Sequence, residues 1–368
     1  IGFKRSYINF SDIYMGSVDG SNSNLGMGTR VNSVKQDFSL GRIETSSSGL
    51  DLSLANSGFF VQRDHGTGLT SYTRAGRLNF DSNGYLVGFG GVIQGFPALN
   101  GVVQHSGNLV DLQLPKTALP AQSTAKIGMG VNLNSNENLI ATPFNATDPT
   151  TYNYRSDETI YDSLGNPYVA SMFYVKTADN AWTTQFAVDN TVLGTGALSF
   201  SDTGALSAST GLSNLAWTPA NGAAAGSLSV DLTGSTQYAG SNQFYNQSQN
   251  GCPSGMPIGC AIDGNGYLNV SYSNGMSLIQ GQIAVAQFNS DLGLSKSDSM
   301  SWVPTTESGS AIIDPNASQS AFLSNSIEYS NVDLTQELVN LISAQHDFQA
   351  NAQAQQTYNQ VLQTIEKL

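Results

Sequence analysis

Two stretches of this 368-residue chain share one pattern, DSNGYLV (81–87) and DGNGYLNV (263–270). Each places an Asp, an Asn and a Gly directly before a short apolar alternation. An Asp and an Asn separated by one residue can begin a calcium-binding loop, and they can also form the tip of a β-hairpin. The choice between these two readings decides whether the surrounding sequence predicts a metal site or a scaffold of strands.

A calcium loop of the familiar kind needs further oxygen ligands and a bidentate acid at its twelfth position. Val92 and Asn274 stand at that position after Asp81 and Asp263. Asn-Gly before an alternating run is instead typical of hairpins, because glycine tolerates positive φ. We therefore expect no bound metal at either motif, and two hairpin turns within one β domain, made by these residues: Asp81, Asn83, Gly84, Asp263, Asn265 and Gly266.

The surrounding sequence predicts a mainly β chain with two β-rich domains and one long C-terminal helix. Residues 46–120 and 257–328 resemble each other in strand and turn pattern, which indicates one discontinuous β domain. Residues 121–256 carry short strands at near-regular spacing, which predicts an inserted β domain with either a sandwich or a barrel-like fold. The polar, glycine-dotted residues 1–45 are expected to be an extended connector with little core.

The C-terminal residues 329–368 differ in kind, because from Ser330 onward they contain neither Gly nor Pro and carry apolar residues three and four apart. This spacing predicts an amphipathic helix of roughly 34 residues, about 50 Å long, capped by Ser330 or Asp333. Such a stripe must be buried against another subunit, against a segment outside this sequence, or against the β domain. The stripe comprises Leu334, Leu338, Leu341, Ile342, Phe348, Ala352, Leu362 and Ile365.

Charge and composition exclude several classes of partner. Charged residues make up 11% of the chain and the net charge is −13, while eight of the 14 basic residues lie in the first 77 positions. Nucleic-acid binding needs a positive surface, and an anionic membrane is disfavoured for the same reason. No apolar run approaches the roughly 20 residues that span a bilayer. We therefore expect neither nucleic-acid binding nor membrane insertion.

Residues that could carry chemistry are few. Cys252 and Cys260 in GCPSGMPIGC could close a disulfide, or they could be two free thiols. Three scattered histidines cannot be assigned to a zinc site, and neither a nucleophile elbow nor a phosphate-binding loop occurs. The sequence therefore predicts no enzyme, no catalytic residue, no metal site and no cofactor.

Six segments resemble one known family, the bacterial flagellar rod and hook proteins. LDLSLANSGFFV (50–61) with YTRAGRLNFDSNGYLVGFGGVIQGFPA (72–98) is similar to its core signature, and residues 330–368 resemble its C-terminal helix. ETIYDSLGNPYVASMFYVK (158–176) and SYSNGMSLIQGQIAVAQFNSDLGL (271–294) resemble the hook branch of the family. IGFKRS (1–6) resembles the stretch that follows the family's N-terminal helix, which this sequence lacks.

The resemblance implies a structural subunit that polymerises into a curved, flexible, hollow tube. This tube would be a universal joint that transmits torque from rod to filament outside the cell. The family's partners would be further copies of the chain, the rod and hook-filament junction proteins, the hook cap, and the type III flagellar export apparatus. The alternatives are a distal rod subunit and an extracellular β-sandwich adhesin. A rod subunit is shorter and lacks an insert like 121–256, and an adhesin leaves the terminal helix unexplained.

Overall fold

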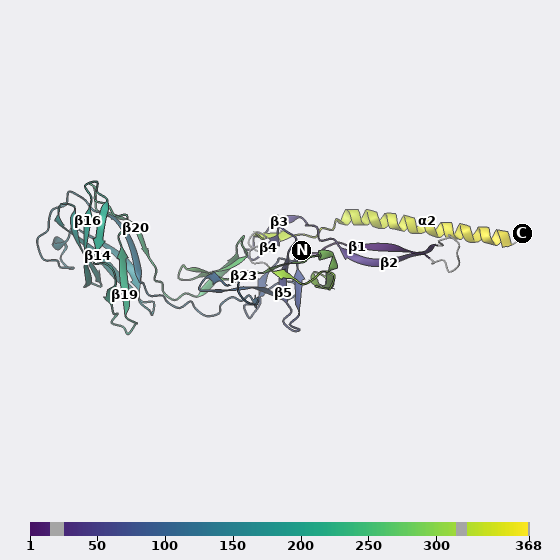
Figure 1. Cartoon of the computed structure of the whole chain (residues 1–368), viewed down its shortest axis with the longest axis horizontal. Coiled ribbons are helices and arrows are strands. Elements are labelled where there is room, and N and C mark those ends of the chain that lie inside the picture. The colour runs from purple at the N-terminus through teal and green to yellow at the C-terminus, as the bar shows by residue number, and fades with distance from the viewer. Residues whose placement is uncertain (15–25, 314–321, 367–368) are drawn as a thin grey trace. The chain divides into compact units, whose positions relative to one another are not determined.

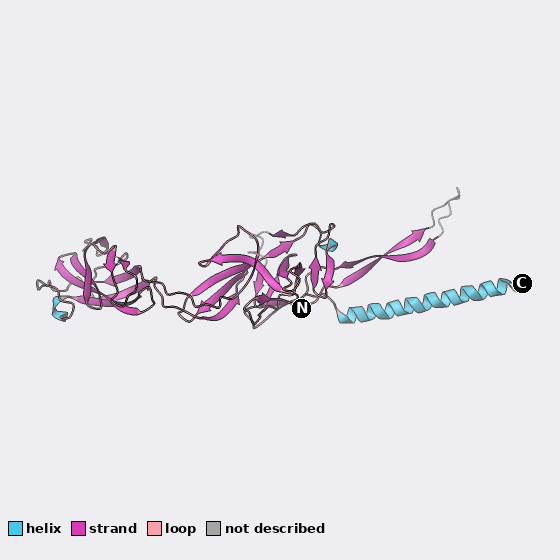
Figure 2. Cartoon of the chain, turned by 90° about the horizontal axis from the view of Figure 1, so that it is seen from below, coloured by secondary structure: helices cyan, strands magenta, loops and turns pink. Residues whose placement is uncertain are grey.

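The computed structural model describes residues 1–14, 26–313 and 322–366. Nearly all regular structure is β, with one long helix at the C-terminal end (Figures 1 and 2). Contacts divide the chain into two compact units. Unit 1 comprises 1–115, 260–270 and 278–368, and unit 2 comprises 116–259 and 271–277. The boundaries expected at 120/121 and 256/257 differ from this division by a few residues, and the 271–277 turn belongs with unit 2.

Unit 1 contains most of the short strands. They are β1 Ser6–Tyr14, β2 Gly26–Gln36, β3 Ile43–Thr45, β4 Leu52–Leu54, β5 Phe59–Arg63, β6 Thr70–Thr73, β7 Asn79–Phe80, β8 Leu86–Val87, β9 Val92–Leu99, β10 Val102–Val103, β11 Val110–Asp111, β24 Val285–Gln287, β25 Ser295–Asp298, β26 Ser301–Val303, β27 Ile312–Ile313, β28 Phe322–Ser324 and β29 Ser326–Glu328. A short 3₁₀ turn covers Asp291–Gly293, and helix α2 covers Leu334–Glu366. Strands β21 Pro257–Ile262, β22 Tyr267–Tyr272 and β23 Ser277–Ile283 run across the division between the units.

The Phe59–Phe60–Val61 run lies at the centre of unit 1. Successive side chains of a strand point to opposite faces, so Phe60 packs into one core cluster with Leu52 and Leu78, whereas Phe59 and Val61 pack into a second cluster. Both faces of β5 are therefore buried, which explains why this strand is continuously apolar. The longest path of hydrogen-bonded strands in its sheet is β21-β22-β23-β9-β5-β6-β26-β25.

The first 45 residues correct one expectation. Instead of an extended connector, β1 and β2 pair as an antiparallel ribbon from Ser6↔Gln36 to Tyr14↔Gly26, and β3 pairs with β29. Alternation of polar and apolar residues in SYINFSDIY supports a ribbon, but the many glycines and serines that follow masked that pattern. The expectation of little core holds for the described ribbon side chains, which are mostly exposed.

Unit 2 holds a five-stranded and a four-stranded sheet around one core. The five-stranded order is β13-β14-β15-β16-β17, and the four-stranded order is β18-β19-β12-β20. Ile127, Met172, Trp182, Phe186 and Leu228 are among the buried residues between them. The strands are β12 Lys126–Asn132, β13 Tyr154–Tyr161, β14 Pro167–Ala178, β15 Ala181–Val188, β16 Thr191–Phe200, β17 Leu206–Thr210, β18 Leu215–Trp217, β19 Gly226–Asp231 and β20 Gln243–Gln249, with a 3₁₀ turn at Pro149–Thr151.

Candidate functional site

The apolar stripe of α2 is exposed. Leu334 is 82% exposed, Phe348 75% and Ile365 62%. The other described members of the stripe, Leu338, Leu341, Ile342 and Ala352, are also exposed. Leu362 lies within the helix, but its side chain is outside the described part of the structure. Most helical stability in proteins comes from tertiary packing of an apolar face, so the exposure of the described α2 side chains indicates a surface for a partner.

The helix begins at a well-defined cap. The Asp333 carboxylate accepts hydrogen bonds from the backbone N–H groups of Thr335 at 2.8 Å and Gln336 at 3.2 Å. These are two of the four N–H groups that a helix leaves without an intrahelical acceptor. Of the two capping candidates, Asp333 therefore has this role, while the Ser330 hydroxyl accepts a bond from Val332 before the helix.

A buried ion cluster lies five residues before the cap. Glu328, at the end of β29, receives hydrogen bonds from the Lys4 Nζ at 2.6 Å and from an Arg74 guanidinium nitrogen at 3.3 Å. The Gly41 backbone N–H donates to the same carboxylate at 2.9 Å. All three charged side chains are at most 1% exposed. The cluster joins the N-terminal segment, the β6 end and the strand that leads into α2.

The two cations of this cluster have different further partners. The Lys4 ammonium also donates to the Ser39 carbonyl at 2.6 Å, and the Arg74 guanidinium also donates to the Asn56 carbonyl and lies 5.3 Å from the centre of the Phe59 ring. Burial lowers the pKa of both groups, and Glu328 opposes that shift in each. Since an unpaired buried charge is costly, Glu328 holds these three segments in one geometry.

A second, exposed set of contacts ties the helix start to the base of the β1–β2 ribbon. Arg5 lies 3.2 Å from the Asp37 carboxylate and 3.7 Å from the Glu337 carboxylate in the first turn of α2. The Asn331 side chain accepts from the Arg5 backbone N–H at 2.9 Å and donates to the Asp37 carbonyl at 2.8 Å. The start of α2 and the base of the β1–β2 ribbon are therefore tied to each other within unit 1.

The two D-x-N-G-Y-L motifs form matching hairpin turns in unit 1. Asp81 accepts from the backbone N–H groups of Asn83 at 2.9 Å and Tyr85 at 2.8 Å, and the turn joins β7 to β8. Asp263 accepts from Asn265 at 2.9 Å and from Tyr267 at 3.0 Å, between β21 and β22. The glycines that follow, Gly84 and Gly266, have φ of 82° and 75°.

The cysteines do not form the candidate disulfide. Cys252 is a buried free thiol in unit 2, where its backbone pairs with Gln122 in an isolated bridge. Cys260 is a half-buried free thiol on β21 that packs against the core cluster containing Leu52 and Phe60. Each thiol is thus held by the packing of a different unit. Burial raises the pKa of Cys260.

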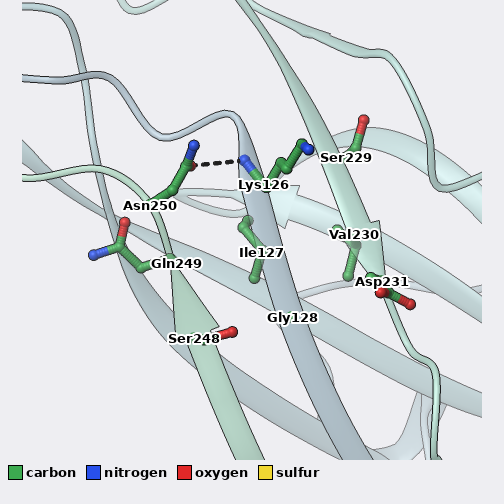
Figure 3. A pocket seen from close by; sticks show the side chains of 9 residues that line it. All are labelled: Lys126, Ile127, Gly128, Ser229, Val230, Asp231, Ser248, Gln249 and Asn250. Atoms are coloured by element: carbon green, nitrogen blue, oxygen red, sulfur yellow. Dashed lines mark hydrogen bonds between the residues drawn. The ribbon is translucent and has the colours of Figure 1, made fainter. Parts of the chain in front are cut away.

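A shallow hollow of about 480 Å³ lies over three strands of unit 2, β12, β19 and β20 (Figure 3). Gly128 leaves space on β12, where a Cβ would come within 2.7 Å of the Ser248 hydroxyl. Asn250 accepts the Lys126 backbone N–H at 2.9 Å. The lining has one cation, Lys126, and one carboxylate, Asp231, so it does not assemble an acid–base pair or a ligand set. Within 1–14, 26–313 and 322–366, no three His, Cys, Asp or Glu side chains gather as metal ligands.

Comparison with known proteins identifies two parts of the chain. Residues 132–252 match the family described as the flagellar basal body protein FlaE D2 domain, and residues 323–368 match the flagellar basal body rod FlgEFG protein C-terminal family. The flagellar hook protein FlgE of Escherichia coli K12 is 33% identical over 378 residues, covering all of this chain and 92% of that protein. The chain belongs to the flagellar hook protein family.

Other hook proteins match over the same span. The FlgE of Salmonella typhimurium is 33% identical over 380 residues, and that of Borreliella burgdorferi is 29% identical over 411, each covering all of this chain and 92% of the relative. The crystal structure of Helicobacter pylori hook protein FlgE2 shares the fold, with a TM-score of 0.55 at 13% identity over 79% of this chain and all of that one. This protein is therefore a structural hook subunit, and the rod and adhesin alternatives are set aside.

The sequence reasoning missed the ion cluster. Lys4, Arg74 and Glu328 are far apart in the chain, and each stands among residues that look like ordinary strand positions. Only one signal was available, the concentration of basic residues in the first 77 positions of an acidic chain. No described helix is both long and apolar enough to cross a membrane.

Proposed function

We propose that this hook-family chain polymerises into a curved, flexible, hollow tube that acts as a universal joint between rod and filament. The observation that carries the proposal is the apolar stripe of α2, which is exposed along its described length. The helix follows the buried ion cluster at Glu328 in the chain. Burying apolar surface at about 25 cal/mol per Å² would stabilise an inner wall that does not slide. A rigid anchor at Glu328 would transmit torque from that wall to the β units.

Unit 2 is weakly charged and polar, which suits contacts that slide past one another. Residues 116–259 carry nine acidic and four basic residues, and they are rich in Ser, Thr, Asn and Gln. Weak, hydrated polar contacts exchange partners at low cost. We infer that copies of unit 2 contact one another through such surfaces as the tube bends, and that export by the flagellar type III apparatus delivers the subunits outside the cell. Hook cap, rod and junction proteins would meet the tube during assembly and at its ends.

Electron microscopy of the assembled protein tests this function. A curved tube is the expected result, and a straight one would argue for a rod. The decisive variant is Leu338→Ser with Leu341→Ser, which removes two exposed stripe residues that belong to none of the three core clusters. It should abolish tubes, whereas Leu69→Ser, a matched loss of an exposed leucine in the β5–β6 turn, should leave them intact. Tubes of normal length from the stripe variant would contradict the proposal.

A further inference from the structure

The outer face of β12 carries almost no side chains along its middle. Successive residues of a strand point to opposite faces, and Ile127, Met129 and Val131 point into the unit 2 core. Gly128 and Gly130 therefore lie on the other face of the sheet. The hollow of about 480 Å³ over β12, β19 and β20 is centred on Gly128 (Figure 3). Its room comes from the missing side chain at this central position.

A fixed aromatic ring lies beside this hollow. A Cβ on Gly130 would come within 2.8 Å of the Tyr245 ring, so the ring covers Gly130 on the outer face. Tyr245 is 52% exposed, and its hydroxyl donates to the Gly234 carbonyl, which fixes the ring. Gly130 is two residues from Gly128, about 7 Å along the strand. The ring and the hollow therefore form one continuous surface.

Asn250 offers a free donor at the rim of the hollow. Its Oδ1 accepts the backbone N–H groups of Ala125 and Lys126, both at 2.9 Å, which fixes the plane of the amide. Within the described part of the chain, no group accepts a hydrogen bond from its Nδ2. That nitrogen carries two N–H donors. The oriented amide is therefore able to donate to a ligand.

Two further polar groups flank Gly128. Asp231 lies beside it on β19, and Ser248 lies opposite it on β20 (Figure 3). One Asp231 oxygen accepts the Thr233 backbone N–H at 2.9 Å and the Thr233 hydroxyl at 2.5 Å, whereas the other takes no hydrogen bond from any residue that the structure describes. The Ser248 hydroxyl can donate and accept. Hydrogen-bonding groups thus lie on both sides of the same glycine.

These features select a class of ligand. Along the hollow β12 is hydrogen-bonded to both β19 and β20, so it has no free edge for an added peptide strand. Among the nine lining residues the charges of Lys126 and Asp231 cancel, which disfavours an ionic ligand. An uncharged oligosaccharide has the matching chemistry. Its hydroxyl groups exchange hydrogen bonds with amides and carboxylates, while the apolar face of a sugar ring packs on an aromatic ring.

We propose that the unit 2 hollow and the Tyr245 ring together bind an uncharged oligosaccharide. One sugar ring stacks on Tyr245, and the next lies over Gly128. The free atoms of Asn250 and Asp231 hold the hydroxyl groups of that second sugar. The site uses no residue of the α2 stripe, so its failure would leave the proposed polymerisation untouched, and the reverse also holds.

Saturation-transfer NMR on the full chain tests the binding. Cellohexaose, maltohexaose and chitohexaose are the uncharged probes, and a galacturonic acid hexamer is the charged control. At least one uncharged hexamer should receive magnetisation from the protein and show saturable binding, and the acidic hexamer should bind more weakly. If none of the three uncharged hexamers binds at millimolar concentration, or if the acidic hexamer binds best, the inference is wrong.

Tyr245→Ala should raise the dissociation constant of the bound hexamer about tenfold, since it removes the stacking surface. Tyr245→Phe keeps the ring and should stay close to the unmodified chain. Tyr245 lies outside the core cluster of unit 2, so both variants should fold. Equal dissociation constants for the two variants would show that the ring takes no part in binding and would overturn the inference.

Gly128→Val should abolish binding, because its side chain fills the hollow. The Ser248 hydroxyl, 2.7 Å from the added Cβ, can rotate away. Gly226→Val is the matched control, since nothing lies within 4 Å of a Cβ at Gly226, which is on β19 outside the hollow. It should bind as the unmodified chain does, and an equal loss in both glycine variants would contradict the site. Thermal unfolding checks that both fold, and if Gly128→Val does not, the two Tyr245 variants decide.

Discussion

Glu328 accepts a 2.6 Å hydrogen bond from the Lys4 ammonium across 324 positions of sequence, with both side chains excluded from water. The same carboxylate also pairs with Arg74, so it links the N-terminal segment, the end of β6 and β29 within unit 1. The Glu328 carboxylate is therefore the counterion of two buried cations. The stability of this region should therefore depend on it far more than on any exposed ion pair.

Glu328→Ala should destabilise unit 1 by about 3–5 kcal/mol, because it leaves two buried charges without a counterion. Glu44→Ala is the control. Glu44 lies opposite Ile327 on the neighbouring strand and pairs only with the exposed Arg42, so its loss should cost about 1 kcal/mol or less. Hydrogen exchange of the β3 and β29 amides measures both, with the unit 2 amides as an internal reference. Equal protection in the two variants would show that the cluster does not anchor the strands.

Asp333→Ala should weaken the start of α2 by about 0.5–2 kcal/mol, since the N–H groups of Thr335 and Gln336 lose their acceptor. The far-UV helix signal reports this directly, because α2 is the one long α-helix in the described part of the chain. Asp347→Ala, in the exposed middle of the helix, should not reduce the signal. A helix signal that survives Asp333→Ala unchanged would mean that contacts other than the cap hold the first turn.

Gly266→Ala should be more damaging than Gly275→Ala, although the two glycines have φ of 75° and 80°. Positive φ strains an alanine at either site by about 1–2 kcal/mol. At Gly266 the new Cβ would also come within 2.2 Å of the Phe322 ring, whereas at Gly275 nothing lies within 4 Å. Thermal unfolding should show a clearly larger drop in Tm for Gly266→Ala. Similar drops would indicate that Phe322 moves aside freely.

Unit 2 should lose stability between about pH 4 and pH 2. Burial alone would raise the pKa of Asp162, but bonds from Asn166, Asn221 and the backbone N–H groups of Asn166 and Leu164 lower it to about 2. A carboxyl whose folded pKa lies below its unfolded value stabilises the fold above the unfolded pKa and loses that contribution as the pH falls.

Unfolding of Asp162→Asn should depend less on pH across this range, while Asp179→Asn, an exposed unit 2 control, should follow the parent chain. In a Trp302→Phe background the remaining tryptophans, Trp182 and Trp217, report unit 2 alone. An unchanged pH profile for Asp162→Asn would show that another group controls acid unfolding.

Local sequence chemistry determined the elements of this protein. The positions of Asp and Asn-Gly predicted the turns at 81–84 and 263–266. Glycine adopts positive φ, and the Asp oxygens accept hydrogen bonds from backbone N–H groups within the next four residues. Apolar spacing together with the absence of Gly and Pro after Ser330 predicted α2, and Asp333 was one of two candidate caps, with Ser330. These features depend on neighbours along the chain, so their physical basis is fully present in the sequence.

Only the tertiary structure showed which contacts join segments that are far apart in the sequence. The pairing of Lys4 and Arg74 with Glu328 depends on burial, and burial arises only when strands from both ends of the chain meet. The ribbon depends on the register between β1 and β2, and the state of Cys252 and Cys260, which are both free thiols, is a property of the folded chain. Such contacts depend on the closure of long loops, which no local pattern encodes.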